Sequence, residues 1–93
     1  MKDEKGIRLD IQRGMKAKQI LDEPLIKEFF ETYRGNLVDR LSESNIDPEL
    51  EKEYVRMLKV SKQFKKSFEN YIKTGKKAEG LLEKLKEKIR GKA

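Results

Sequence analysis

One run of residues constrains the fold of this chain more than any other, because it repeats at alternating steps of four and three. It begins at Leu50 and continues through Tyr54, Met57, Ser61, Phe64, Phe68, Tyr71, Gly75, Ala78, Leu82 and Leu85 to Ile89. A repeat of 3.5 residues kept in phase for about 40 residues is typical of the seam of a left-handed coiled coil. The sequence therefore predicts a long amphipathic helix, which would extend about 60 Å if it is continuous.

Two glycines lie within this run and bear on its continuity. Gly75 and Gly80 each cost about 1 kcal/mol relative to Ala inside a helix. One alternative is therefore a helix that ends near Gly75 and a separate helix over residues 78–89. Because the repeat keeps its phase across Gly75, we favour one continuous helix. The small residues Ser61, Gly75 and Ala78 would also let a partner helix approach closely.

The two prolines indicate where helices begin. Pro24 follows Asp22 and Glu23, and Pro48 follows Asp47, so each proline can occupy the first helical turn behind an acidic residue that can cap it. We predict helices over residues 5–21, 24–43 and 48–90. The first is interrupted by Gly6 and Gly14, and its alternation over residues 7–11 also fits a short strand. Helix is favoured there because no second strand is available for pairing.

The apolar residues predict how these helices pack. The second helix carries an apolar face formed by Ile26, Phe29, Phe30, Tyr33, Leu37 and Leu41. Leu58, Val60 and Ile72 widen the stripe of the third helix, where the second can lie antiparallel against it. Beyond about residue 76 we expect the shorter helices not to reach. The apolar residues Leu82, Leu85 and Ile89 would then need another cover, which favours a homo-oligomer or docking onto another protein.

Composition supports an ordered, charge-rich helical chain. Of the 93 residues, 35% are apolar and 43% are charged. Low hydrophobicity is also the signature of disorder, but the ordered spacing of the apolar residues argues against that alternative. No apolar run approaches the roughly 20 residues that span a bilayer, and the N-terminus has no apolar stretch typical of a secretory signal. We expect a soluble protein with no membrane partner.

The residue inventory argues against catalysis. The chain has no Cys and no His, so it lacks a thiolate nucleophile, an imidazole base and the commonest ligands of transition metals. Carboxylate pairs such as Glu79/Glu83 and Glu49/Glu53 lie among lysines, as on a solvated helix face. Gly75-Lys76-Lys77 lacks the spaced glycine and strand of a phosphate-binding loop. We predict no enzymatic activity, no cofactor or metal, and no small-molecule substrate.

Charge is divided unevenly along the chain. Residues 1–55 hold 10 Lys/Arg and 13 Asp/Glu, a balance of −3, whereas residues 56–93 hold 13 and 4, a balance of +9. Seven lysines of the basic half, opposed nearby only by Glu69, are candidates for phosphate contacts: Lys59, Lys62, Lys65, Lys66, Lys73, Lys76 and Lys77. The alternative is a solvated face, or a surface for the acidic half of another copy. Arginine is scarce here, so any nucleic-acid contact would be weak and sequence-independent.

Several local features between residues 13 and 78 together resemble one group of proteins. Arg13-Gly14-Met15-Lys16-Ala17 leads into Ile20-Leu21-Asp22-Glu23-Pro24-Leu25, then Glu28-Phe29-Phe30, Tyr33 and a capped long helix containing Tyr71-Ile72-Lys73-Thr74-Gly75-Lys76. This combination resembles small, mostly uncharacterised helical proteins encoded among the head and packaging genes of tailed bacteriophages. That family often has a Trp near the end of the second helix, whereas this chain has none. The resemblance therefore assigns no functional residue and implies a context only.

These observations predict an all-α protein, a helical hairpin or three-helix unit with a long, coiled-coil-like third helix in a single domain. We expect a non-enzymatic structural or interaction protein that acts through helix–helix contacts. The resemblance implies a phage virion-assembly or virion-associated component, present in the host cytoplasm during assembly or in the virion. Its predicted partner seam consists of Phe64, Phe68, Tyr71, Ala78, Leu82, Leu85 and Ile89. The alternative is a non-specific nucleic-acid-binding accessory, such as a terminase small subunit or a packaging factor.

Overall fold

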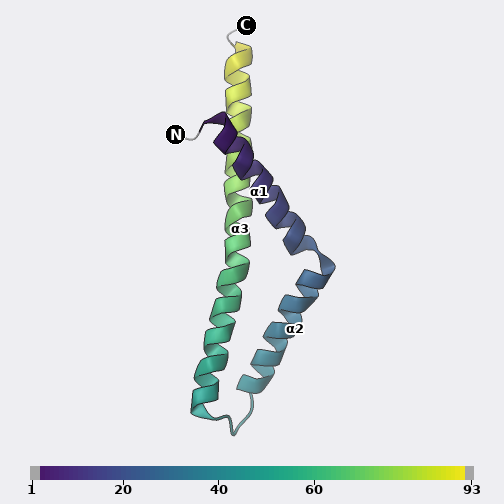
Figure 1. The fold of residues 1–93 in the computed structure, drawn as a ribbon, viewed down its shortest axis with the longest axis vertical. Coiled ribbons are helices and arrows are strands. Elements are labelled where there is room, and N and C mark those ends of the chain that lie inside the picture. Colours follow the sequence, from purple (N-terminus) through teal and green to yellow (C-terminus); the bar gives the residue numbers. More distant parts are fainter. Residues whose placement is uncertain (1–2, 92–93) are drawn as a thin grey trace. The chain divides into compact units, whose positions relative to one another are not determined.

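The computed structural model describes residues 3–91, which form three helices (Figure 1). They are α1 (Glu4–Asp22), α2 (Pro24–Leu41) and α3 (Pro48–Gly91). The described residues contain no strand, and the stretch at residues 7–11 is helical. The all-α fold with a helical hairpin and a long third helix is therefore confirmed. α3 is a single helix of 44 residues that continues through both Gly75 and Gly80.

The two proline-marked helix starts are built differently. At α3, the Asp47 carboxylate accepts a hydrogen bond from the backbone N–H of Glu49 at 3.3 Å, as a capping side chain should. At α2, the N-cap position is Glu23, and its side chain makes no capping hydrogen bond, so the predicted acidic cap is absent there. Glu23 is extended (φ −63°, ψ 123°), because a residue before proline is disfavoured in the helical region. This one residue separates α1 from α2.

α2 ends at Leu41, two residues earlier than predicted. The Ser42 hydroxyl donates a hydrogen bond to the carbonyl oxygen of Val38 at 2.9 Å, and its backbone N–H donates to the same oxygen at 3.0 Å. Ser67 makes the same hydroxyl bond inside α3, so this bond does not by itself end a helix. The backbone N–H of Glu43 instead donates to the carbonyl oxygen of Arg40, three residues back, at 3.3 Å. The four-residue spacing of the α-helix is lost there, and Glu43 lies in the turn that leads to α3 rather than in α2.

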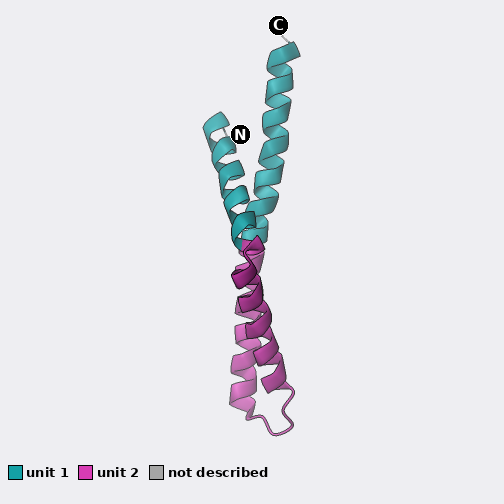
Figure 2. Cartoon of the chain, turned by 90° about the vertical axis from the view of Figure 1, so that its right-hand side faces the viewer, with its two compact units in different colours: residues 1–20, 68–93 teal, residues 21–67 magenta. Residues whose placement is uncertain are grey.

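The chain divides into two compact units, which Figure 2 shows in different colours. Unit 1 combines Met1–Ile20 with Phe68–Ala93, and unit 2 is Leu21–Ser67. Unit 1 thus contains most of α1 and the C-terminal part of α3, whereas unit 2 contains α2 and the N-terminal part of α3. Each unit is an antiparallel pair of helices with its own small core.

The core of unit 1 is a close helix crossing. A Cβ added to Gly14 of α1 would stand 2.9 Å from the Cα of Gly75 and 2.9 Å from the carbonyl oxygen of Tyr71. Ile7, Ala17 and Ala78 are buried around this crossing. Small residues on both helices let the two backbones touch, and this contact offsets the cost of placing Gly75 inside a helix. The glycine that suggested a break is thus a packing position.

The core of unit 2 is the hairpin of α2 and α3. Leu37 is buried, and Phe30 places its ring 6.1 Å from that of Phe64. Near the turn, the guanidinium of Arg40 lies over the Tyr54 ring, 5.8 Å from its centroid, and donates a hydrogen bond of 3.3 Å to the Tyr54 hydroxyl. This cation–π contact and hydrogen bond join the two helices where the hairpin closes.

Two residues expected inside the hairpin lie outside it. Phe29 of α2 and Val60 of α3 are each 57% exposed, because adjacent helix positions differ by about 100° in direction and only one of Phe29 and Phe30 can face α3. Ile72, also expected to pack against α2, belongs to unit 1.

Candidate interaction surfaces

The predicted partner seam is divided between the two units, and its residues differ widely in exposure. Phe64 lies in unit 2, and the other six lie in unit 1. Ala78 is only 3% exposed, and Phe68 and Leu82 are partly buried. The exposed members are Phe64, Tyr71, Leu85 and Ile89. The seam therefore has a covered middle and exposed positions on either side.

The middle of the seam is covered by α1 of the same chain. A Cβ added to Gly75 would stand 3.0 Å from the Cα of Gly14 and 3.1 Å from the carbonyl oxygen of Asp10. The antiparallel register of this crossing places Ile7, which is 4% exposed, opposite the turn of Ala78 and Leu82. The expectation that the shorter helices stop short of residue 76 is therefore wrong. α1 packs along α3 past that point because Gly14 lets the two backbones touch.

The end of α3 extends beyond the described part of α1. Leu85 is exposed, and Ile89 is 71% exposed. Leu81, which lies outside the four–three repeat, is exposed as well. α1 begins at Glu4, so its antiparallel register leaves Ile89 without an opposite residue in that helix. Exposed residues of this size continue the seam beyond the cover that α1 provides.

A second exposed apolar surface lies on α2, and sequence reasoning had placed its central residue in the core. Phe29 stacks on Tyr33 with ring centroids 5.8 Å apart and meets Phe30 edge-on at 5.7 Å. Leu25 lies one turn away and is also exposed. The adjoining depression, of about 460 Å³, is lined by α2 residues: Leu25, Glu28, Phe29, Thr32, Tyr33 and Asn36. The surface is therefore the side of one helix rather than a cleft.

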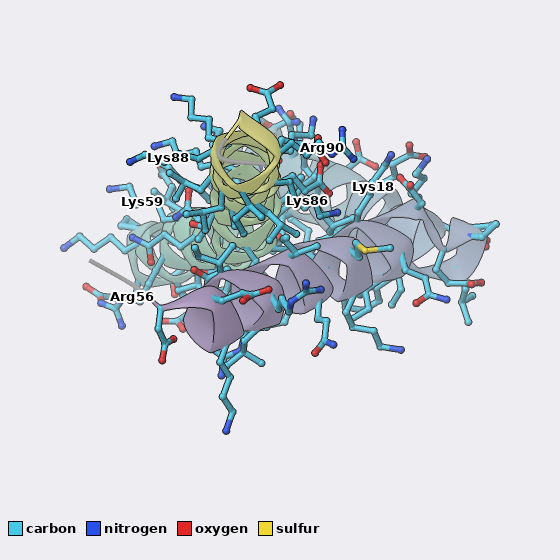
Figure 3. The ribbon with its side chains drawn as sticks, turned by 90° about the horizontal axis from the view of Figure 1, so that it is seen from above. Lys18, Arg56, Lys59, Lys86, Lys88 and Arg90 are labelled. Atoms are coloured by element: carbon cyan, nitrogen blue, oxygen red, sulfur yellow. The ribbon has the colours of Figure 1, made fainter. Side chains whose placement is uncertain are left out.

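The seven predicted phosphate-contacting lysines are all exposed. They do not share one direction, however. Lys65 lines a depression of about 440 Å³ together with Asp22 and Glu31, in a mixed-charge environment. Figure 3 shows that Lys86 and Arg90 project from one side of α3, whereas Lys88 projects from the opposite side. The basic side chains of α3 therefore point in different directions.

Carboxylates are distributed along exposed helix faces. Glu49, Glu53, Glu79 and Glu83 are all exposed. Over residues 3–91 no group of three or more His, Cys, Asp or Glu side chains is placed to hold a metal ion. In the same range, no helix is both long and apolar enough to span a membrane.

Comparisons with known protein families, with characterised proteins and with solved structures find no match to this chain. The candidate functional features of this chain are the surfaces described above, chiefly the exposed continuation of the α3 seam and the lysines around it.

Proposed function

We propose that this protein is a non-enzymatic interaction protein that associates with further copies of itself through helix–helix contacts. The exposed seam at the end of α3, formed by Leu85 and Ile89, is the main contact. Tyr71 and Phe64 extend the seam in their respective units. This helical segment forms a coiled coil with the same segment of another copy.

The observation that carries this proposal is the imbalance between buried and exposed apolar residues. The buried hydrophobic residues among those described are Ile7, Ala17, Leu37 and Ala78. Thirteen large hydrophobic residues in that range are exposed, Leu85 and Ile89 among them. Fully burying such a side chain is worth about 1.5–3 kcal/mol. Covering the exposed seam in an oligomer would therefore add a stabilisation that a single copy lacks.

The biological context is proposed from the resemblance over residues 13–78 to small helical proteins of tailed bacteriophages. In that context the protein assembles in the host cytoplasm and becomes part of, or docks onto, the virion. An elongated helix with an exposed apolar end is suited to joining subunits. The phage assignment can be tested separately, by mass spectrometry of purified virions.

The self-association is tested by two matched double variants of the full chain. Leu85→Ser/Ile89→Ser removes two exposed apolar residues from the seam. Leu9→Ser/Leu81→Ser removes two exposed leucines of the same unit that lie outside the seam. We expect the first variant to lose association in sedimentation velocity and the second to keep it, with both helical by circular dichroism. Equal association of both variants with the wild type would contradict the assignment.

A further inference from the structure

The solvent-facing side of α3 carries a row of lysines that the proposed self-association does not use. The row consists of Lys59 and Lys66 in unit 2, and of Lys73, Lys77, Lys84 and Lys88 in unit 1. We call these six residues the lysine face. They follow one another at steps of seven and four, which return a helical side chain to nearly the same direction. All six are exposed.

The lysine face differs from the set that the sequence suggested. Lys62 lies at its edge, and Lys65 and Lys76 lie about a quarter turn away from it. Lys65 also adjoins Asp22 and Glu31. Lys84 and Lys88 join it, because α3 is continuous and the same steps carry the row past Gly80. In Figure 3, Lys88 projects away from the side on which Lys86 and Arg90 lie.

Within residues 3–91 the charges of this face have no ion-pair partner. The residues between its lysines on the same side include the neutral Gln63 and Asn70 and the exposed Leu81, and the nearest carboxylates, Glu69 and Glu87, border it. Ion pairs elsewhere join Arg8 to Glu4 and Arg56 to Glu53. Over residues 3–91 none of the six lysines has a carboxylate within ion-pair distance. Each ammonium group is therefore free for an external anion.

The lysine face and the part of the seam that α1 covers lie on different sides of α3. Gly75 and Leu82 lie nearly half a turn from the lysines, whereas Ala78, Leu85 and Ile89 lie about a quarter to a third of a turn from them. Packing of α1 on the covered part of the seam leaves the lysines in solvent, since all six are exposed. A partner of the lysine face can therefore bind without displacing α1.

From this arrangement we infer that the lysine face binds the phosphate backbone of nucleic acid without reading its sequence. The row within unit 1 extends from Lys73 to Lys88, about 22 Å at 1.5 Å per residue, and duplex DNA presents about one negative charge per 1.7 Å of its axis. Each phosphate that a lysine neutralises releases condensed counterions, which supplies a driving force even when the surface has few apolar residues. Lysines contact phosphates and so position the nucleic-acid backbone. Without arginines that read base edges, they do not select a sequence.

An acidic protein is a poorer match for this surface. Exposed ion pairs between proteins contribute only about 0–1 kcal/mol each, so a stable protein complex needs apolar contacts at its centre. The lysine face offers chiefly ammonium groups and the amides of Gln63 and Asn70, with Leu81 as a single large apolar side chain among its described residues. A folded protein surface with dispersed carboxylates also lacks the condensed counterions of a nucleic acid.

The test compares two triple variants with the same change in charge. Lys77→Gln/Lys84→Gln/Lys88→Gln removes three lysines of the face. Lys18→Gln/Lys76→Gln/Lys86→Gln removes three lysines of the same unit that lie off it. Binding of the full chain to a fluorescent random-sequence DNA duplex is measured by anisotropy over a range of salt concentrations. Circular dichroism confirms that both variants are helical.

We expect wild-type binding whose log–log salt dependence becomes shallower by about 2.7 in the face variant, because three fewer phosphates are neutralised. The control variant should keep a slope close to that of the wild type. Absence of wild-type binding at low salt would overturn the inference, as would equal losses in the two variants. Equally tight, face-dependent binding to polyglutamate or to vesicles containing phosphatidylserine would also overturn it, since the partner would then not be nucleic acid.

Discussion

Gly14 of α1 and Gly75 of α3 approach so closely that a methyl group on Gly14 would stand 2.9 Å from the Gly75 Cα. The same group would stand 2.9 Å from the Tyr71 carbonyl oxygen. Both neighbours are backbone atoms, so neither can move aside as the end of a flexible side chain could. The separation of the two helices in unit 1 is therefore set by this pair of glycines.

Gly14→Ala should destabilise the protein, although alanine is the better helix former. Separating the two helices to admit the methyl group costs about 1–3 kcal/mol, as overpacking does elsewhere. This exceeds the gain of about 1 kcal/mol in helix propensity. Chemical denaturation followed by circular dichroism measures the difference.

Gly80→Ala is the matched control for that variant. Gly80 lies inside α3, and a Cβ there would have open space around it. Only the propensity gain applies, so this variant should be more stable than the wild type by about 0.5–1 kcal/mol. Stabilisation of both variants would show that the helices of unit 1 do not touch at Gly14.

Asp47→Ala should reduce stability by about 1 kcal/mol, because it removes the side chain that accepts the N–H of Glu49 at the start of α3. Glu23→Ala is the counterpart at the start of α2, where the side chain makes no capping bond. It should leave the midpoint of thermal unfolding almost unchanged. The account of the two helix starts fails if both substitutions lower the midpoint equally.

Phe30→Ala and Phe29→Ala should differ in their cost to stability, because Phe30 packs between α2 and α3 and Phe29 lies on the outer side of α2. Phe30 is partly buried and its ring lies 6.1 Å from that of Phe64, so its truncation should cost about 2 kcal/mol. Phe29 is 57% exposed, so its truncation should cost less than about 1 kcal/mol. Urea unfolding of the two variants gives the comparison. A larger loss at Phe29 would mean that the hairpin is rotated relative to the structure.

Much of the fold could be predicted because helical periodicity is a local property. The steps of four and three from Leu50 to Ile89 predicted α3, and Pro48 behind Asp47 predicted its first turn. The end of α2 was missed by two residues because the backbone N–H of Glu43 bonds to Arg40, three residues back, in place of a helical partner four residues back.

The partner of each helix face could not be predicted in the same way. Gly14 was interpreted as an interruption of the first helix, because glycine costs helix stability when no neighbour is considered. Its role in packing appears only in the folded chain, where Gly75, 61 positions later, lies against it. For the same reason Ala78 was assigned to an external partner, although α1 already covers it. Phe29 and Phe30 are adjacent residues of the same type, so the sequence does not tell which of them lies in the core. Phe30 lies there because its side of α2 packs against α3.

The direction in which the lysine side chains point could not be predicted from the sequence either. Their number and their lack of neighbouring carboxylates were evident from the sequence, but their direction depends on whether α3 is broken at Gly75. Continuity of that helix brings Lys84 and Lys88 onto the face of Lys73 and Lys77 and leaves Lys65 and Lys76 aside.

Sedimentation equilibrium of the wild-type full chain, over a wide range of protein concentration, tests the proposed self-association most directly. Because the exposed seam at Leu85 and Ile89 gains stability only when another copy covers it, the average mass should rise with concentration from monomer towards a defined oligomer. Circular dichroism of the same samples should show a helical chain throughout. A single monomeric species at the highest concentration, with the helices intact, would contradict the account.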